Sequence, residues 1–247
     1  MQATETASPP SRALLFMEGR AVFELGAFVA SLPWLRRLPR GDGHPVLVFP
    51  GLAASDLSTR PMRGLLRNRG YKTHGWQLGR NLGLRPGVFG GMLQRLDALT
   101  DRHGEKISLI GWSLGGIYAR ELAKIRPKSV RQVISMGSPF GGHPKATHAW
   151  RLYEFTSGHS VDDPPIKTTL SEPPPVPTTS IFSKTDGVVP WQNCQQANGQ
   201  KVENIRVEGS HMGLGHNPMV LYVVADRLAQ PEGKWRPFSY PNPLAGR

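Results

Sequence analysis

A glycine-rich turn between two apolar segments constrains this chain more than any other stretch. The turn is Gly111-Trp112-Ser113-Leu114-Gly115-Gly116, which follows an apolar run at residues 107–110 and precedes a helical pattern at residues 117–125. Small residues at positions 111 and 115 let the backbone turn so sharply that one serine stands alone at its tip. The segment therefore predicts a strand, a tight turn and a helix in direct succession.

The rest of the chain alternates short apolar runs with helical patterns. Strands are expected at residues 45–49, 71–74, 106–110, 130–136, 181–183 and 205–207, and helices at residues 62–69, 88–103, 114–125 and 216–228. Strands that alternate with helices form a mainly parallel sheet with helices on both faces. The sequence thus predicts an α/β fold of three layers, in which ligands bind at the carboxyl ends of the strands.

The length and the cysteine content suit one domain of this kind. A chain of 247 residues can bury a full core without disulfides, and its single cysteine, Cys194, has no partner for one. We expect residues 41–247 to form the α/β domain and residues 1–40 to form a tail and an amphipathic helix packed on its core. We expect no metal and no cofactor, because the sequence has neither an H-E-x-x-H motif nor a phosphate-binding loop.

Residues 12–35 have apolar positions at helical spacing but also contain charges. Glu18, Arg20 and Glu24 interrupt the apolar stretch, which argues against a secretory signal and against a membrane-spanning helix. We therefore expect a cytoplasmic protein. We favour a helix that packs on the domain surface and ends at Pro33 or Pro39, with an interfacial membrane helix as the alternative.

The composition is strongly basic. The chain carries 30 Lys and Arg against 18 Asp and Glu, which gives a formal net charge of +12 at pH 7. The basic residues are scattered and no nucleic-acid-binding motif accompanies them, so we expect no nucleic-acid partner. An arginine-rich surface without a specific partner is the favoured interpretation, and a weak association with an anionic membrane surface is the alternative. No oligomeric state is indicated.

The serine at the tip of the turn, Ser113, is a candidate nucleophile. A serine hydroxyl attacks poorly unless a base accepts its proton, and the base is usually a histidine oriented by a carboxylate. In this architecture the acid follows the serine along the chain and the histidine comes last. Asp186 follows the expected strand at 181–183, and His211 lies between the last strand and the last helix. We expect Ser113, Asp186 and His211 to be catalytic.

Other histidines and carboxylates fit this order less well. Three histidines lie between Ser113 and Asp186 along the chain, and a fourth falls at the start of the last expected helix; they are His143, His148, His159 and His216. The carboxylates of the long connection, and one within the last helix, are likewise less suitable as the orienting acid. These are Asp162, Asp163, Glu172 and Asp226.

A tetrahedral intermediate at a carbonyl carbon needs hydrogen-bond donors for its oxyanion. One donor is the N–H of the residue after the nucleophile, which is Leu114. The other is expected in the loop after an early strand, where Gly51 permits a tight backbone that aims the N–H of Leu52 into the site. A plain strand-ending turn is the alternative interpretation of this loop. We expect Leu52 and Leu114 to form the oxyanion hole.

With these elements in order, residues 44–230 resemble the α/β-hydrolase superfamily, and within it bacterial lipases and esterases. The segment Pro-Gly-Leu-Ala-Ala-Ser-Asp at residues 50–56 is similar to the His-Gly-Leu-x-Gly-x-Asp oxyanion segment of bacterial triacylglycerol lipases. Pro50 replaces the family histidine, which keeps the backbone donor and removes a side-chain support. The resemblance implies hydrolysis of small-molecule or lipid esters through an acyl-enzyme. An acyltransferase, a thioesterase and a non-catalytic binding protein remain alternatives.

The connection at about residues 140–177 breaks the alternation of strands and helices. It is rich in glycine and proline and much longer than the usual connection of about 4–6 residues. We expect a short lid or cap insertion there. Its aromatic residues are expected to bind substrate together with one residue of the turn, although they would equally suit a small separate core. The candidate substrate-binding residues are Trp112, Trp150, Tyr153 and Phe155.

Overall fold

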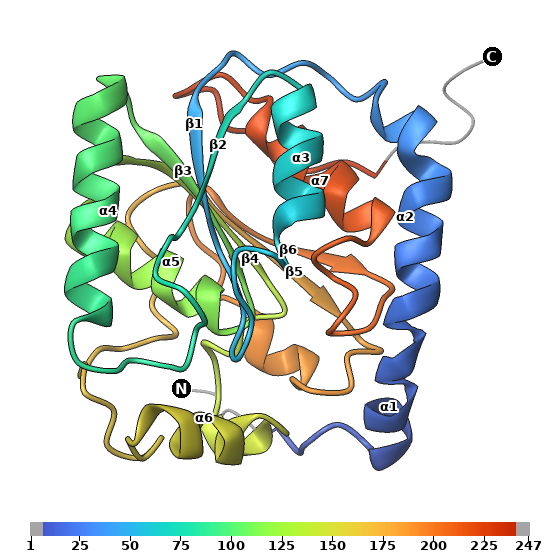
Figure 1. The fold of residues 1–247 in the computed structure, drawn as a ribbon, viewed down its shortest axis with the longest axis vertical. Coiled ribbons are helices and arrows are strands. Elements are labelled where there is room, and N and C mark those ends of the chain that lie inside the picture. The colour runs from blue at the N-terminus through green and yellow to red at the C-terminus, as the bar shows by residue number, and fades with distance from the viewer. Residues whose placement is uncertain (1–6, 241–247) are drawn as a thin grey trace.

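A sheet of parallel strands forms the centre of the computed structural model, which describes residues 7–240 (Figure 1). The sheet has six strands in the order β2-β1-β3-β4-β5-β6, and every neighbouring pair is parallel. The expected α/β class with a parallel sheet is therefore confirmed. The strands are β1 Pro45–Phe49, β2 Lys72–Gly75, β3 Ile107–Trp112, β4 Val130–Met136, β5 Thr178–Ser183 and β6 Val202–Val207.

Helices cover both faces of the sheet, which the apolar strand sequences require. Every residue of β1 and β3 is buried, as expected for parallel strands that are covered on both sides. Successive side chains of β1 point to opposite faces: Val46 and Val48 belong to one core cluster, and Leu47 and Phe49 belong to the other. The three-layer arrangement predicted from the sequence is therefore present.

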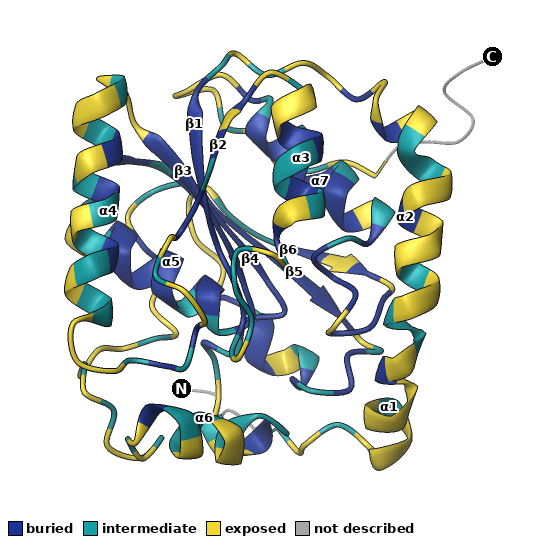
Figure 2. Ribbon diagram, viewed as in Figure 1, coloured by how far each residue is buried: buried dark blue, intermediate teal, exposed yellow. Residues whose placement is uncertain are grey.

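The two layers of helices lie on opposite faces of the sheet (Figure 1). The first core lies beneath α2, α3 and α7, and the second lies beneath α4 and α5. Figure 2 shows the buried faces of these helices turned toward the sheet. Their bounds are α2 Ala21–Leu35, α3 Arg60–Asn68, α4 Val88–His103, α5 Leu114–Ile125 and α7 Pro218–Leu228.

The N-terminal segment is three helical pieces rather than one helix. It consists of α1 Arg12–Phe16, the 3₁₀ turn η1 Met17–Arg20, and α2, which packs beside α7. Of the two expected ends, Pro33 is wrong, because it lies inside α2; the helix ends at Leu35, four residues before Pro39. A proline so close to the last residue, Leu35, removes the hydrogen bond of only one N–H from a helix that buried contacts hold in place. Phe28 and Leu35 make those contacts.

The long connection at residues 140–177 lies beyond the carboxyl ends of the strands (Figure 1). It contains the 3₁₀ turn η2 Pro144–Ala146 and one short helix, α6 Trp150–Ser157; a further 3₁₀ turn, η3 Trp191–Cys194, follows β5. Its function as a lid stays a prediction. Within residues 7–240 no helix has both the length and the apolar content needed to cross a membrane.

Close backbone packing explains the glycines of the turn between β3 and α5. A Cβ atom at Gly115 would lie 2.5 Å from the carbonyl oxygen of Phe49 in β1, and one at Gly111 would lie 2.2 Å from the carbonyl oxygen of Gly115. Both obstacles are backbone atoms, which cannot rotate away. Glycine at these positions therefore lets α5 start directly against the ends of the central strands.

This packing predicts opposite effects for two glycine-to-alanine substitutions. Gly115→Ala should lower the free energy of unfolding by about 1–3 kcal/mol, because the methyl group overlaps backbone atoms. Gly90→Ala, in α4, has no atom within 4 Å of the new methyl group and should raise the free energy of unfolding by about 0.4–1 kcal/mol. Urea unfolding curves measure both, and equal shifts for the two variants would refute the packing argument.

Candidate active site

Ser113 joins β3 to α5 in a backbone conformation that few non-glycine residues adopt. Its φ is +54° and its ψ is −123°. Such a conformation costs on the order of 1–3 kcal/mol and persists only where the surroundings enforce it. One of the enforcing contacts is the N–H of Ser113, which donates to the carbonyl of Met136 at 2.8 Å. The serine is thereby held at the carboxyl edge of the sheet.

The structure brings the three predicted residues of this edge into one hydrogen-bonded series. The distance between His211 Nε2 and Ser113 Oγ is 3.0 Å, and the distance between His211 Nδ1 and Asp186 Oδ2 is 2.7 Å. All three side chains are buried. With Nδ1–H donating to the carboxylate, Nε2 is left to accept the proton of the serine hydroxyl.

The second oxygen of Asp186 is also satisfied, which fixes the carboxylate. Its Oδ1 accepts the N–H groups of Val188 and Val189, both at 2.8 Å. The loop after β5 therefore wraps around its own aspartate and aims Oδ2 at the histidine. These backbone donors stabilise the ionised carboxylate, which is the form that orients and stabilises a protonated imidazole.

Opposing influences set the basicity of His211. Burial alone would lower the pKa of the imidazole, but the charge of Asp186, its hydrogen bond to the ring and the charge of Glu18 together raise the pKa above its ordinary value of 6.5. A raised pKa makes the neutral ring a stronger base toward the hydroxyl of Ser113. The neutral form is the one that can accept a proton.

Glu18 is the functional residue that the sequence analysis missed. Its Oε1 accepts the N–H groups of Gly187 at 2.8 Å and of His211 at 2.9 Å, and its Oε2 accepts the N–H of Met212 at 2.8 Å. One buried carboxylate thus bridges the loop that carries Asp186 and the loop that carries His211. The available signal was a charge inside an apolar helical pattern, because a buried charge must be paired.

The two other charges of the N-terminal segment bind the same loops. Arg20 donates to the carbonyl of Thr185 at 2.6 Å and to its hydroxyl at 3.0 Å. Glu24 accepts the N–H of Ser210 at 2.8 Å and pairs with Arg20 at 3.4 Å. The charges that interrupt the apolar pattern therefore point inward, toward the loops that hold the site.

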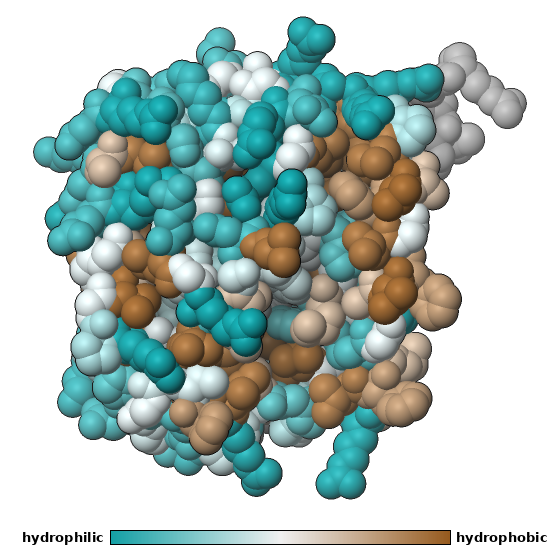
Figure 3. All heavy atoms as spheres, viewed as in Figure 1, coloured by the Kyte–Doolittle hydropathy of each residue, from teal (hydrophilic) through white to brown (hydrophobic). Residues whose placement is uncertain are grey.

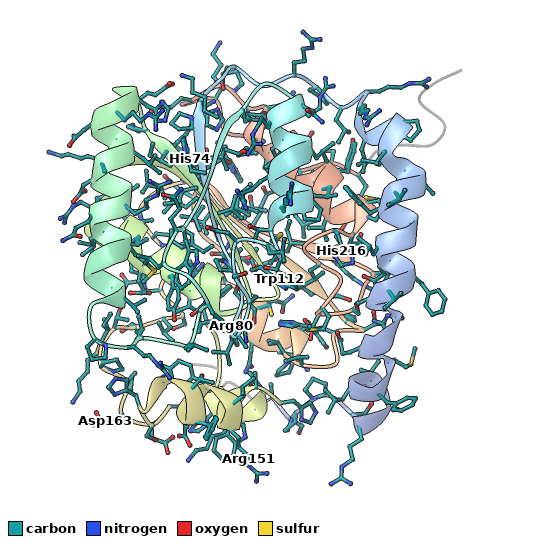
Figure 4. All side chains as sticks on the ribbon, viewed as in Figure 1. His74, Arg80, Trp112, Arg151, Asp163 and His216 are labelled. Atoms are coloured by element: carbon teal, nitrogen blue, oxygen red, sulfur yellow. The ribbon has the colours of Figure 1, made fainter. Side chains whose placement is uncertain are left out.

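Trp112 does not line a substrate cavity, contrary to the sequence-based expectation. Its indole N–H donates to the carbonyl of His211 at 3.0 Å, and a Cβ atom added at Gly215 would lie 3.1 Å from its ring. Figure 4 labels Trp112 near the ends of the strands and His216 on the side of α2. Trp112 therefore supports the loop that carries His211 through a hydrogen bond to its backbone.

Two candidate backbone donors belong to residues that line the cavity at Ser113. Within residues 7–240, neither the N–H of Leu52 nor that of Leu114 donates to a protein acceptor, and both residues line the cavity at Ser113. The loop of Leu52 is braced by buried Asn81, whose side chain donates to the carbonyl of Pro50 at 2.8 Å. The backbone of Asn81 also pairs with Ala53 and Ala54. Sequence reasoning did not single out Asn81.

An apolar cavity opens beside Ser113. Trp150 and Tyr153 of α6 lie in its wall, as expected, whereas Phe155 does not, because its side chain points outward and is 86 % exposed. The lining residues are Leu52, Leu84, Phe89, Ser113, Leu114, Ile117, Tyr118, Glu121, Pro139, Pro144, Thr147, Ala149, Trp150, Tyr153, Val161, Pro164, Ile166, Thr168, Leu170 and Val189.

The carboxylate of Glu121, which lines this cavity, is paired with other side chains. The carboxylate of Glu121 accepts from Lys124 and from the hydroxyl of Thr168, both at 2.8 Å. The cavity therefore presents carbon atoms and satisfied polar groups, with the Ser113 hydroxyl at its wall. Such a lining suits an uncharged, apolar group.

The remaining candidates lie away from the Ser113 hydroxyl. His148 bonds the carbonyl of Pro10, and His216 bonds the carbonyl of Ala21 and precedes α7 instead of starting it. Asp163 lies at the outer edge of the molecule, where it pairs with a lysine (Figure 4). Across the described residues, no group of three or more His, Cys, Asp or Glu side chains is arranged to hold a metal ion.

A second hydrogen-bonded series of Ser, His and Asp lies at the amino ends of the strands, opposite to the carboxyl ends that hold Ser113. His44 Nδ1 lies 2.5 Å from Asp42 Oδ1, and His44 Nε2 lies 2.8 Å from Ser108 Oγ. Ser108 is fully buried within β3, and its hydroxyl also accepts from Gln132 at 3.4 Å. A substrate carbonyl has no access to this hydroxyl, so the second series is structural.

Comparison with solved structures identifies the fold. The chain superposes on lipase B of Aspergillus fumigatus with a TM-score of 0.56 and 17 % identity, covering 78 % of this chain and 54 % of that one. It superposes on an alpha/beta hydrolase enzyme from the metagenome of sediments of the Mar Chica lagoon, Morocco, with a TM-score of 0.52 and 20 % identity over 76 % and 91 % of the two chains. The chain has the α/β-hydrolase fold.

A further α/β-hydrolase-like structure is a pyrethroid hydrolase from Sphingobium faniae JZ-2. It has a TM-score of 0.55 and 14 % identity over 76 % of this chain and 98 % of that one. The chain thus spans about half of the fungal lipase and nearly the full length of the two others. No protein-family model matches the sequence, and no curated protein matches it significantly.

The electrostatics of the site predict how His211 titrates. We expect NMR titration of its imidazole signals to give a pKa above 6.5. Glu18→Gln removes a negative charge that raises this pKa, so the midpoint should move to lower pH. Glu24→Gln removes a carboxylate that also binds the histidine loop but is not among the groups that shift this pKa, so its midpoint should stay close to that of the wild type. A midpoint in Glu18→Gln at or above the wild-type value would contradict the assignment.

Proposed function

We propose that this chain is a serine hydrolase that cleaves carboxylic esters with an apolar acyl group. The observation that carries the proposal is the hydrogen-bonded series from Ser113 through His211 to Asp186 beside an apolar cavity. The solved structures of similar fold are named as a lipase, an alpha/beta hydrolase enzyme and a pyrethroid hydrolase, in line with hydrolytic chemistry.

In the first half of the proposed reaction, Ser113 Oγ attacks the ester carbonyl carbon while His211 Nε2 accepts the hydroxyl proton. The carbonyl π electrons move onto oxygen, and the N–H groups of Leu52 and Leu114 donate to that oxyanion. Asp186 holds the ring in the required tautomer and stabilises its cation. When the tetrahedral intermediate collapses, the C–O bond to the alcohol breaks and His211 protonates the departing alcohol.

The second half repeats these steps with water. The product of the first half is an acyl group in ester linkage to Ser113. His211, neutral again, accepts a proton from water as the water oxygen attacks the acyl carbonyl. The second intermediate collapses with cleavage of the bond to Ser113 Oγ, which takes the proton back from His211 and releases the carboxylic acid.

The cavity supports an apolar acyl group as the recognised part of the substrate. Its wall is carbon-rich, and its one carboxylate, Glu121, is paired with Lys124 and Thr168. Burying an acyl chain there gains about 0.8 kcal/mol for each methylene that leaves water. A charged acyl chain would find no counter-ion in the cavity.

A panel of p-nitrophenyl esters tests the proposal. We expect kcat/KM to be higher for the octanoate than for the acetate, and Ser113→Ala to lose at least about 10⁴-fold in kcat. Ser108→Ala, which removes the serine of the buried second series, is the matched control and should keep its activity. Equal background hydrolysis by wild type and Ser113→Ala on every ester would refute the proposal.

Narrowing the cavity tests where the acyl chain binds. Ile166→Trp fills space in the cavity wall and should lower kcat/KM for the octanoate by about tenfold or more, because pocket volume decides which chains fit. The acetate, which needs little of the cavity, should be affected much less. Phe155→Ala is the control, since this side chain is exposed outside the cavity. Equal losses on both esters in Ile166→Trp would place the acyl chain elsewhere.

A further inference from the structure

The N-terminal helical segment, residues 12–35, presents its apolar side chains to solvent. Phe16 is 90 % exposed, Phe23 is 81 % exposed and Val22 is 73 % exposed, and more than half of the exposed large hydrophobic side chains of residues 7–240 belong to this segment. Figure 2 shows the exposed stripe along α2, and Figure 3 shows hydrophobic atoms gathered on the same side of the molecule. We call this stripe the outer face of the segment.

This arrangement inverts that of an ordinary surface helix, which turns its apolar stripe inward and its charges outward. The three charged residues between positions 13 and 35 are Glu18, Arg20 and Glu24, and all three bind the loops beneath the segment. Their inward contacts leave the outer face without a charge. Contiguous apolar surface of this kind marks a site of contact with another apolar body.

Positive charges at the two ends of the outer face indicate which kind of apolar partner it contacts. Arg12 precedes the stripe, and Arg36, Arg37 and Arg40 follow it, all of them exposed. Within residues 7–41 the carboxylates are those of Glu18 and Glu24, and both face inward. An apolar stripe with cationic ends is complementary to a lipid surface with anionic headgroups.

We propose that the outer face docks on a membrane surface that carries anionic lipids, with the segment lying in the plane of the interface. Phe16 and Phe23 would enter the acyl region, and the arginines at the ends would contact headgroup phosphates. Trp34 supports this placement: it is 46 % exposed at the end of α2 and stacks on Tyr222 at 5.6 Å, where its ring suits the headgroup level.

A second copy of this chain is a poorer occupant of the same face. Pairing two outer faces would bring together two sets of exposed arginines on chains that each carry a formal charge of +12. Like charges brought together oppose association, whereas an anionic lipid surface attracts the same charges.

The chain just before the segment also contacts the connection that lines the cavity. The carbonyl of Pro10, just before α1, bonds His148, which lies between the cavity residues Thr147 and Ala149. Delivery of a lipid ester to Ser113 would rest on the proposed function, whereas the docking itself does not.

Vesicle flotation tests the docking without turnover, because Ser113→Ala can serve as the parent protein. We expect it to float with vesicles of phosphatidylcholine containing about one third phosphatidylglycerol, and much less with phosphatidylcholine alone. Phe16→Ser/Phe23→Ser should weaken binding at least tenfold, because two large apolar rings no longer leave water for the acyl region. Ile125→Ser, an exposed apolar residue of α5 on the other face of the sheet, is the matched control and should bind normally.

Two further variants and one fluorescence signal sharpen the test. Arg37→Glu/Arg40→Glu should abolish the preference for anionic vesicles. Vesicles with brominated acyl chains should quench part of the tryptophan emission of the parent protein. The quenched part should be missing in Trp34→Phe, which would assign it to Trp34 at the membrane.

Failure to float with anionic vesicles would overturn the proposal, and so would unchanged flotation of the Phe16/Phe23 variant. A concentration-dependent dimer that this variant abolishes would assign the face to a second copy instead. Activity on soluble p-nitrophenyl esters is measured without vesicles, so failure of the docking and failure of the proposed function give separate results.

Discussion

A single buried carboxylate, that of Glu18, joins the two loops on which the geometry of the site depends. It accepts three backbone N–H groups, one from the loop after β5 and two from the loop after β6. Hydrogen bonds to a charged group contribute about 1.5–3 kcal/mol each. The segment that carries Glu18 also has to turn its other charges inward, which leaves its apolar residues outside. The position of His211 and the exposed outer face thus share one origin.

The two Ser–His–Asp series show that residue types alone do not make a site. His44 and His211 both lie between an aspartate and a serine hydroxyl. Burial lowers the pKa of His44 despite its hydrogen bond to Asp42, and the charge of Arg131 lowers it further, whereas two carboxylates raise the pKa of His211. Ser108 is buried within a strand, but Ser113 stands on a strained turn beside a cavity, where the N–H groups of Leu52 and Leu114 have no acceptor among residues 7–240. The two series therefore differ in the access of substrate to the serine hydroxyl, in the backbone strain at the serine and in the presence of nearby N–H donors.

Local sequence patterns predicted the parts of this structure that local physics determines. Apolar runs marked the buried parallel strands, and the glycine spacing at residues 111–115 marked the turn that holds Ser113. The rule of chain order then pointed to Asp186 and His211, which lie next to Ser113 only in the folded chain. Trp112 was wrongly placed in the cavity, because the pattern showed an aromatic residue beside the serine but not the direction of its ring. Phe155 was misplaced for the same reason.

The sequence pattern marked Glu18 as a charge inside an apolar segment but did not show which groups it contacts. It contacts backbone groups of residues 187, 211 and 212, and backbone N–H groups leave no signature in a sequence. Pro33 shows a related limit, since a proline ends a helix only where tertiary contacts do not hold the next residues in place. The buried contacts of Phe28 and Leu35 do so here.

The most direct test of the central claim is covalent trapping of the nucleophile. A p-nitrophenyl alkylphosphonate places a tetrahedral phosphorus where the ester carbonyl would react and leaves a stable adduct. The account predicts one adduct per chain, mapped by peptide mass spectrometry to Ser113, formed faster with a longer alkyl group, and absent in Ser113→Ala. No adduct, or an adduct on any other residue, would contradict it.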